Sequence, residues 1–353
     1  MRFSDFVTLQ RGFDLPKTEM CDGPYPVIGS TSIIGYHDNF KAEPPGVVTG
    51  RSGSLGTVQF VSERYWPHNT SLWVKDFKGN DPKFVYYCMK GMDFARFNAG
   101  AGVPTLNRNH LDTLEVSVPS LPIQRRIAGI LSAYDELIEN SQRRIKILEQ
   151  MARALYREWF VHFRFPGHEG HPRVASAVGE IPAGWEVRKV GDVLELNYGK
   201  GLKKEERRDG PYPVYGSSGV VGMHDASLVE GPGIIVGRKG NVGSVFWCDD
   251  DFFVIDTAYF VTSSLPLRFL FYVLPTLNFI NSDAAVPGLS RNQAYALEFL
   301  VPPAPILDEF CDLANTFERQ ASTLQCQIQT LRRTRDLLLP RLLAGQVELA
   351  EVA

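Results

Sequence analysis

One segment of this chain occurs twice, and this repeat constrains the fold more than any other feature of the sequence. Residues 23–58 read GPYPVIGSTSIIGYHDNFKAEPPGVVTGRSGSLGTV, and residues 210–245 read GPYPVYGSSGVVGMHDASLVEGPGIIVGRKGNVGSV. Half of the aligned positions are identical at a shift of 187. Chance does not produce such a match. The chain therefore contains two copies of one structural unit.

The repeat extends to a turn and to a helical segment. VPTL at residues 103–106 matches VPGL at residues 286–289. The helical segment 123–159 then matches 306–342 at a shift of 183. Each copy is thus predicted to be a globular domain followed by a long helix. Two similar binding domains in one polypeptide predict a target with two similar parts.

Length and composition agree with two domains. A chain of 353 residues has room for two domains that each bury a core. The hydrophobic content of 44%, with 31 glycines and 23 prolines, is typical of a loop-rich globular protein. No apolar run approaches the roughly 20 residues that cross a bilayer, and the N-terminal residues lack the apolar core of a signal peptide. A cytoplasmic location without membrane contact is expected.

The repeat and the turn residues predict the domain boundaries. The predicted division is a first domain over residues 1–120, a central long helix over 121–160, a linker over 161–184, a second domain over 185–303, a C-terminal long helix over 304–344 and a tail over 345–353.

Charge and cysteine content bear on the partner and the compartment. The net charge of −3 argues at first sight against nucleic acid, because binding phosphates calls for a basic surface. Net charge averages over all faces, however, so a basic cleft backed by acidic surfaces fits the same total. The five cysteines are odd in number and form no CxxC pair. They are expected to be free thiols in a reducing compartment.

The local pattern within each domain predicts an α+β fold. In the first domain, strands are expected near residues 46–48, 57–61 and 114–118, separated by glycine turns. Residues 81–90 begin with Asp-Pro, which predicts an N-cap and a first helical proline. The matching helix of the second domain is expected near residues 266–279. Strands mixed with isolated helices, without a regular βαβ alternation, indicate α+β.

The segment that follows each domain has the spacing of a coiled-coil seam, with apolar or small residues mostly at alternating steps of three and four. At ~1.5 Å per residue, about 35 residues make a helix of roughly 50 Å, which is too long to bury against one domain. We therefore predict that the two helices pair as an antiparallel coiled coil; the alternative is that each helix packs on its own domain. The predicted seams are Ile127, Ile130, Tyr134, Leu137, Ser141, Ile145, Leu148, Ala152, Leu155 and Trp159 in the first helix, and Phe310, Leu313, Phe317, Ala321, Leu324, Ile328, Leu331 and Leu338 in the second.

Apolar residues beyond those that one seam uses predict a further contact. Trp159, Phe160 and the pair Leu342 and Leu343 are the residues for which this contact is expected.

A glycine-rich motif occurs in both copies, at residues 50–56 and 237–243. Glycine at every third position suits a tight turn between strands. The spacing fits neither a Walker A loop nor a dinucleotide fingerprint. The simplest interpretation is a hairpin that only supports the fold. Arg51 and Arg238 lie in these turns, however, and an arginine flanked by polar donors is what contact with guanine or phosphate requires.

Further donors follow the VP turn at matching places in both copies, and the second copy adds a basic cluster. Solvated surface charge is the alternative for each of them. The predicted DNA-contacting residues are Arg51, Ser52, Ser54, Arg108, Asn109, Lys203, Lys204, Arg207, Arg208, Arg238, Lys239, Asn241, Arg291 and Asn292.

No catalytic constellation emerges from the sequence. His168 and His171 are three residues apart in a segment rich in proline and glycine, unlike the helical spacing of a zinc motif, so a linker is predicted. The His-Asp pairs at residues 37–38 and 224–225 accompany no nucleophile motif and are predicted to be turn residues. The chain has no convincing methyltransferase or nuclease motif. It is expected to recognise a target without transforming it, and neither a catalytic nor a metal site is predicted.

Several motifs together resemble one known family. The chain combines the glycine-rich turns and VPxL with LPIQRRIAGILSAYDELIE, which begins at residue 121, and with LLLPRLLAGQVEL at residues 337–349. It resembles the DNA-specificity subunits of type I restriction-modification systems over nearly its whole length. The second copy departs from the pattern at residues 304–308, where APILD replaces LPIQR. Because of this difference, the starts of the two long helices are not expected to contact partner subunits in an identical way.

The resemblance implies a non-catalytic subunit. Its two domains would be target-recognition domains that each read one half of a bipartite site in double-stranded DNA. Its helices would set the gap between the halves and dock two modification (methyltransferase) subunits. No cofactor is expected on this chain; S-adenosylmethionine and ATP would bind partner subunits, which include restriction subunits. The alternatives are a two-headed binding scaffold for a sugar or a protein and, third, a self-contained nuclease.

Overall fold

The computed structural model describes residues 1–98, 104–279 and 288–347. It divides into two compact units. Unit 1 comprises residues 1–143 and 325–353, and unit 2 comprises residues 144–324. Each unit therefore contains one globular domain and a part of each long helix. Among the described residues, no helix has both the length and the apolar character needed to cross a membrane.

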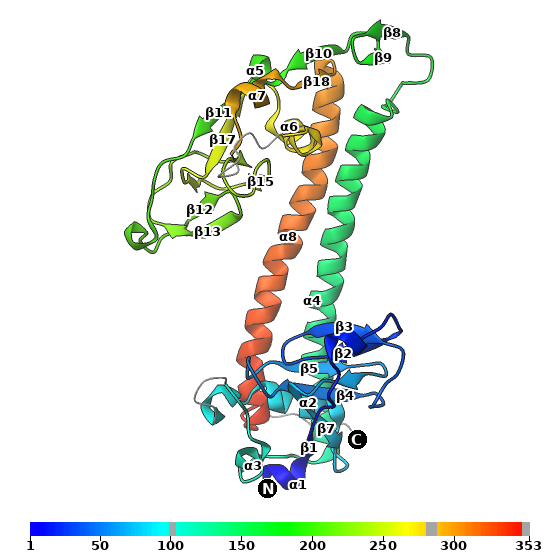
Figure 1. Cartoon of the computed structure of the whole chain (residues 1–353), viewed down its shortest axis with the longest axis vertical. Helices are drawn as coiled ribbons and strands as arrows, with labels where there is room; N and C mark the ends of the chain where they lie inside the picture. Colours follow the sequence, from blue (N-terminus) through cyan, green and yellow to red (C-terminus); the bar gives the residue numbers. More distant parts are fainter. Residues whose placement is uncertain (99–103, 280–287, 348–353) are drawn as a thin grey trace. The chain divides into compact units, whose positions relative to one another are not determined.

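Unit 1 contains two small sheets (Figure 1). The first is antiparallel, in the order β1 (Thr8–Arg11), β7 (Ser71–Asp76), β4 (Gly46–Gly50) and β5 (Val58–Val61). The second has the order β3 (Ile33–His37), β2 (Tyr25–Ile28) and β6 (Trp66–Pro67), with β2 and β6 parallel. Strand β4 is buried at every residue.

The burial of β4 follows from side chains that alternate between the two faces of a strand. Val47 belongs to the main core of unit 1, together with Leu72 and Val74 of the neighbouring strand. Val48 belongs instead to a second cluster, with Ile28 of β2. The strand is thus covered on both sides, which explains its continuous run of apolar and small residues.

The predicted first-domain helix is confirmed as α2 (Pro82–Lys90). The Asp81 carboxylate accepts a hydrogen bond from the Phe84 amide at 2.9 Å, as an N-cap does. The domain also contains α1 (Phe3–Phe6) and α3 (Arg108–Leu111). Capping and the proline at the first helical position therefore set the start of α2 from local sequence alone.

The strand predicted over residues 114–118 is wrong. The pairing there is limited to an isolated bridge between Glu115 and Arg2, flanked by backbone hydrogen bonds of Leu114 and Val116. In unit 2 the corresponding segment does form a strand, β18 (Glu298–Val301), because β10 (Glu186–Lys189) supplies four pairing residues. A regular strand needs a longer partner than the one that Met1 and Arg2 provide here.

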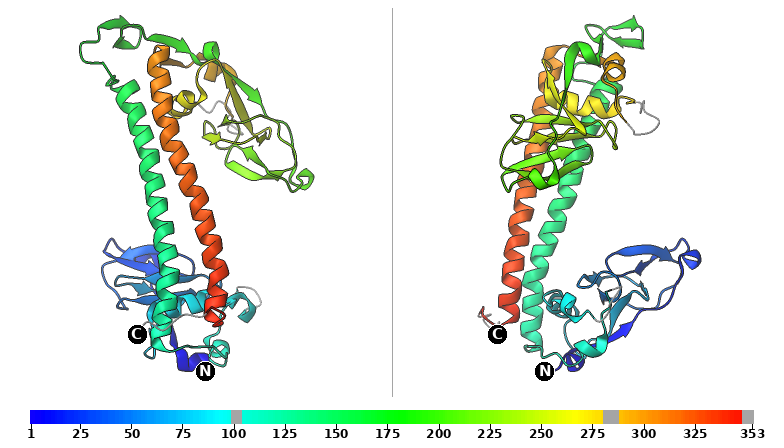
Figure 2. Two further views of the ribbon diagram at one scale, coloured as in Figure 1. Left: turned by 180° about the vertical axis from the view of Figure 1, so that it is seen from behind. Right: turned by 60° about the vertical axis from the view of Figure 1, so that its left-hand side comes forward.

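Unit 2 repeats the architecture of unit 1 (Figure 2). One sheet has the order β11 (Leu194–Tyr198), β17 (Ala258–Ser263), β14 (Gly233–Gly237) and β15 (Val245–Cys248). The other has the order β13 (Gly219–His224), β12 (Tyr212–Gly216) and β16 (Phe253–Val254). The helices are α5 (Val190–Val193), α6 (Leu267–Val273) and α7 (Arg291–Ala296). The predicted fold class, two α+β domains each followed by a long helix, is confirmed.

The segment over residues 161–184 contains a hairpin, β8 (Arg173–Ser176) with β9 (Gly179–Pro182). His168 donates a hydrogen bond from Nδ1 to the Phe165 carbonyl at 2.8 Å. His171 donates from Nε2 to the Ala183 carbonyl at 2.9 Å. Both histidines therefore hold loop backbone in place.

The long helices are α4 (Leu121–Tyr156) and α8 (Ala304–Leu343). In unit 1, Ile127 shares the core with Leu342, and Asp135 forms an ion pair with Arg335. Residue numbers rise along α4 while they fall along α8, so the helices are antiparallel in this unit. In unit 2, Tyr156 near the end of α4 packs against Phe310 near the start of α8, with 6.2 Å between ring centroids.

Pairing and packing on the domains occur together. Ile127 lies in the same core as Phe84 of α2, and Phe310 packs against Phe269 of α6, with 6.5 Å between ring centroids. The two alternatives for the long helices therefore do not exclude one another.

The predicted seams hold except at one position in each helix, where the next residue along is buried instead. Leu137 is 54% exposed, whereas the neighbouring Ile138 is buried. Likewise Leu313 is 40% exposed and Ala314 is buried. An α-helix has 3.6 residues per turn, so its buried face drifts away from a strict alternation of threes and fours.

The apolar residues expected to mark a further contact are internal, so that expectation is wrong. Trp159 and Phe160 belong to the core of unit 2, and Leu342 to the core of unit 1. The large apolar side chains that the long helices do expose are Leu137, Ile147, Met151, Leu313 and Leu337.

Gln124, from the LPIQ motif at the start of α4, has a structural role. Its side chain is buried; Oε1 accepts from the Asp81 amide at 2.9 Å, and Nε2 donates to the Asn80 side chain at 2.8 Å and to the Pro119 carbonyl at 2.9 Å. The amide thus joins α4 to the start of α2. In the second copy, Leu307 stands at the matching position and packs in the core instead, which gives a structural reason for the departure at residues 304–308.

We expect Gln124→Leu to lower the free energy of unfolding by about 1–3 kcal/mol, because it leaves buried polar groups without partners. Urea denaturation measures the change. Gln142→Leu, at an exposed site on the same helix, is the matched control and should change stability by less than about 0.5 kcal/mol. Equal effects of the two substitutions would contradict the structural role.

Candidate nucleic-acid interface

The glycine-rich motif of the first domain forms the turn between β4 and β5. A Cβ on Gly50 would lie 2.1 Å from the Ser54 carbonyl oxygen, so only glycine fits there. Gly53 and Gly56 adopt positive φ angles of 87° and 92°. The predicted hairpin is confirmed in this domain.

The second domain repeats this turn between β14 and β15. A Cβ on Gly237 would lie 2.1 Å from the Asn241 carbonyl oxygen. Gly240 and Gly243 have φ angles of 82° and 74°. The spacing of the glycines therefore reflects the same backbone requirement in both copies.

Backbone hydrogen bonds fasten each turn to the segment that carries the second arginine. In unit 1 the Leu106 amide donates to the Arg51 carbonyl at 2.8 Å, and the Gly53 amide donates to the Pro104 carbonyl at 2.9 Å. In unit 2 the Leu289 amide donates to the Arg238 carbonyl at 2.8 Å. Of the VP turns themselves, Val103, Val286 and Pro287 lie outside the described residues. The turn and the following short helix are thus held together in both domains.

In unit 1 this arrangement brings Arg51, Arg108 and Asn109 to one open cleft of about 650 Å³. The Arg51 guanidinium donates to the Asn69 carbonyl at 3.3 Å, and the Arg108 guanidinium lies 3.5 Å from the Leu9 carbonyl. Arg11, at the end of β1, also lines the cleft. These contacts steady the side chains while the cleft stays open to solvent.

In unit 2 the matching arginines share one aromatic ring. The guanidinium of Arg238 lies 4.8 Å from the centre of the Tyr198 ring, and that of Arg291 lies 4.4 Å from it. Arg238 also donates to the Asp256 carbonyl at 2.9 Å. Both cations gain from the ring face. Two positive groups on one half-exposed tyrosine make a local site that favours an anion.

A second tyrosine, Tyr259, packs against Tyr198 and is uncharged at neutral pH. Burial, followed by a hydrogen bond with Tyr198, raises the pKa of Tyr259 above its ordinary value, and the positive charge of Arg238 only partly opposes these effects. The Tyr259 hydroxyl donates to the Leu289 carbonyl at 3.1 Å. It therefore supports the segment that carries Arg291.

The remaining predicted residues of the turns and short helices lie beside these arginines in sequence. Ser52 forms a backbone bridge with Thr105, and Lys239 forms the matching bridge with Gly288. The others are exposed residues of the turns or of α3 and α7: Ser54, Asn109, Asn241 and Asn292.

The basic cluster at residues 203–208 lies by the other sheet of unit 2. The Arg207 guanidinium donates to the Val221 carbonyl of β13 at 2.6 Å, and that of Arg208 pairs with Asp225 at 3.2 Å. Lys203 and Lys204 are exposed. Arg207 and Arg208 contact the β13 region. Arg238 and Arg291 instead contact residues of β11, of β17 and of the loop before β17. The predicted DNA-contacting residues of this domain therefore lie in two separate groups, one beside β13 and one beside β11 and β17.

The sequence reasoning missed Arg11 and Tyr198. These two residues are related by the same shift of 187 that relates the repeats. Gln10 and Asn197 correspond in the same way, as do Gly12 and Gly199. Extending the repeat upstream of Gly23 would have identified Arg11 and Tyr198 as further candidates beside the two arginines of each domain.

Comparison with known sequences gives a family match. A family model described as the type I restriction modification DNA specificity domain matches residues 1–150 and 182–306. The type I restriction enzyme MjaIX specificity subunit of Methanocaldococcus jannaschii is 25% identical over 307 residues, which cover 76% of this chain and 70% of that protein. A putative type I specificity subunit of Mycoplasma pneumoniae is 25% identical over 238 residues, covering 64% of this chain and 84% of its own length.

Solved structures show the same fold. The S subunit of a type I restriction-modification system from M. genitalium superposes with a TM-score of 0.67 at 19% identity, covering 97% of this chain and 95% of that chain. A chain from a structure concerned with assembly of the type I R-M system gives a TM-score of 0.50 at 13% identity, covering 98% and 97%.

Proposed function

The chain belongs to the type I restriction modification DNA specificity family, and from this premise we propose that it is the subunit that recognises DNA in such a system. Each domain would read one half of a bipartite site in double-stranded DNA. The observation that carries this proposal is the matched arginine pair, Arg51 with Arg108 and Arg238 with Arg291, at equivalent places in both domains. Arginine is the side chain best suited to bidentate contact with guanine and with phosphate.

The two half-sites should differ in sequence. Around the shared arginines, unit 1 places Arg11 and Ser52 where unit 2 places Tyr198 and Lys239. A different set of donors and a different shape select different base edges. The net charge of −3 is no obstacle to this function, because the basic groups are gathered locally in each domain.

The proposal includes partners that perform the chemistry. We expect two modification subunits, which would bind S-adenosylmethionine, and restriction subunits, which would use ATP. The exposed apolar residues of the long helices, such as Leu137 and Met151, support a further protein contact. In this division of labour the present chain recognises DNA and catalyses nothing, and it acts where its partners and DNA are found, in the cytoplasm.

Binding measured at several salt concentrations tests this function. The chain is purified with its modification subunit, and its affinity is compared for duplexes with the intact and the scrambled target, which is first identified by sequencing the host methylome with and without the gene. We expect a preference for the intact target and a steep fall in affinity with salt, since bound phosphates release counterions. Affinity independent of both sequence and salt would favour a scaffold for another ligand.

A further inference from the structure

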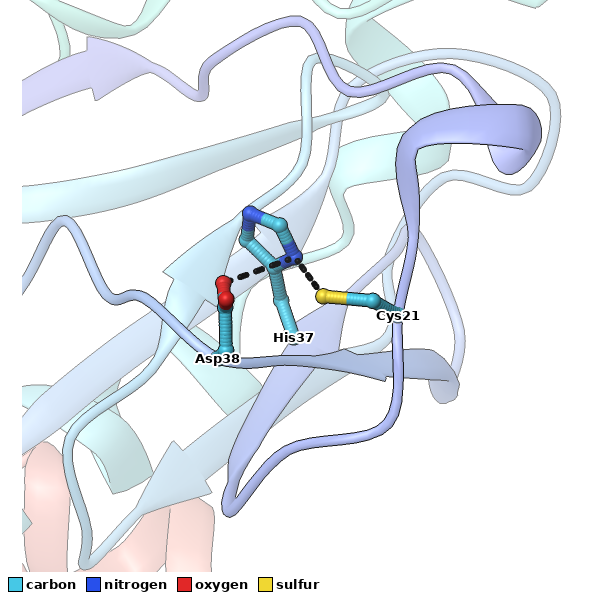
Figure 3. Close-up of side chains that lie close together, drawn as sticks. All are labelled: Cys21, His37 and Asp38. Atoms are coloured by element: carbon cyan, nitrogen blue, oxygen red, sulfur yellow. Dashed lines mark hydrogen bonds and ion pairs between the residues drawn. The ribbon is translucent and has the colours of Figure 1, made fainter.

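Three potential metal ligands meet in unit 1 at the end of β3 (Figure 3). The Cys21 Sγ lies 3.1 Å from His37 Nδ1, and Asp38 Oδ1 lies 3.5 Å from the same nitrogen. Cys21 comes from the loop before β2, whereas His37 ends β3 and Asp38 follows it. The three ligand atoms all lie within 4.8 Å of one another.

The backbone and a neighbouring ring hold this group together. A Cβ on Gly23 would lie 2.2 Å from the His37 carbonyl oxygen, so the loop that carries Cys21 can approach β3 only with glycine there. The His37 ring packs edge-on against Trp66, with 5.1 Å between ring centroids. The histidine is therefore oriented before any ligand arrives, while Cys21 and Asp38 stay open to solvent.

The geometry does not suit nucleophilic catalysis. In a catalytic triad, the nucleophile and the acid contact different ring nitrogens of the histidine. Here the thiol and the carboxylate both face Nδ1 of His37. Convergence of sulfur, nitrogen and oxygen on one point is instead the arrangement of ligands around an ion.

The second domain provides an internal comparison. Arg208, His224 and Asp225 occupy the positions of Cys21, His37 and Asp38. There the Arg208 guanidinium pairs with Asp225 at 3.2 Å, and its backbone amide donates to His224 Nδ1 at 3.2 Å. The second copy thus supplies a cation of its own beside the carboxylate. The contact between histidine and carboxylate is the same in both copies, at 3.5 Å for His37 and Asp38 and 3.4 Å for His224 and Asp225, but in the first copy a thiol takes the place of the arginine.

We propose that Cys21, His37 and Asp38 bind a Zn²⁺ ion. Thiolate, imidazole and carboxylate are zinc ligands, and three protein ligands leave a fourth tetrahedral position for water. Bond lengths of about 2.0–2.3 Å place neighbouring ligand atoms of such a site roughly 3.3–3.7 Å apart, close to the separations from His37 Nδ1 seen here. Coordination through Nδ1 requires the tautomer of His37 that carries its proton on Nε2.

Binding displaces one proton from the protein. The Cys21 thiol loses its proton to solvent as the sulfur–zinc bond forms. The ion then joins the loop before β2 to the end of β3, as the Arg208–Asp225 ion pair does in the second domain. This inference does not depend on DNA recognition, because the group contributes to the fold of one domain.

Isothermal titration of the chelator-treated full chain with Zn²⁺ tests the proposal. We expect one equivalent to bind to the native chain, loss of that equivalent in Cys21→Ser and in His37→Gln, and at least about tenfold weaker binding in Asp38→Asn. Cys326→Ser removes the other exposed cysteine, which lies on α8, and should bind like the native chain. Circular dichroism of each variant separates loss of the site from loss of the fold.

Two further measurements sharpen the test. Arg208→Cys builds the same three ligands into the second domain and should add a second equivalent of Zn²⁺. With Co²⁺ as the probe, a thiolate-to-metal absorption band should appear in the native chain and in Cys326→Ser but not in Cys21→Ser. Failure of the native chain to bind, or equal binding by folded Cys21→Ser, would overturn the proposal. A single equivalent in Arg208→Cys would contradict the comparison between the copies.

Discussion

Replacing Arg238 by alanine should weaken binding to the intact DNA target by about 1–3 kcal/mol and relax base choice at one position of one half-site. The guanidinium is held by the Asp256 carbonyl at 2.9 Å and by the face of Tyr198, so it is positioned before DNA arrives. Arg51→Ala should affect the other half-site in the same way. Binding to a library of duplexes with single base changes, measured with the modification subunit present, reports both effects.

The pattern of the loss distinguishes the possible roles of the arginines. A loss confined to one base position identifies base readout, whereas an equal loss on all sequences identifies a phosphate contact. Arg188→Ala is the control, since Arg188 lies on β10 and pairs with Glu186 at 3.3 Å. Unchanged binding in both Arg51→Ala and Arg238→Ala would show that the glycine-rich turns serve the fold alone.

Phe310→Ala should lower the free energy of unfolding by about 3–5 kcal/mol, the largest stability effect that we expect. Phe310 is fully buried, and its ring centroid lies 4.8 Å from that of Phe160 and 5.7 Å from that of Tyr272. The cavity would open where α4, α6 and α8 meet in unit 2. Urea denaturation or calorimetry gives the change.

Leu313→Ala is the matched control for this prediction. Leu313 lies on the same helix but is 40% exposed, so its truncation should cost less than about 1 kcal/mol. A larger effect for Leu313 than for Phe310 would contradict the burial of the two side chains seen in the structure.

Features with a local physical cause followed from the sequence. The start of α2 at Asp81 and Pro82 was predictable because the cap and the fixed proline φ act within a few residues. The turns that begin at Gly50 and Gly237 were predictable because their conformations exclude side chains at those positions. The repeat itself gave the fold class, since two similar sequences must bury two similar cores.

Features that depend on distant partners did not follow from the sequence. The segment 114–118 has the composition of a strand, yet whether it pairs depends on what precedes α1. Tyr198 lies beside Arg238 and Arg291 only because β11 lies next to β17 in the sheet. The basic residues 203–208 looked equivalent to the loop arginines, but Arg207 contacts β13 instead.

The sequence by itself therefore determined the repeated α+β architecture, the capped helix and the glycine turns, because each rests on backbone geometry or on periodicity that neighbouring residues impose. The tertiary structure alone decided the local adjustment of each buried helix face, at Ile138 and Ala314 rather than one residue earlier. It also decided that Cys21 meets His37 across a separation of 16 residues. Such contacts arise from the packing of whole elements, and no local pattern records them.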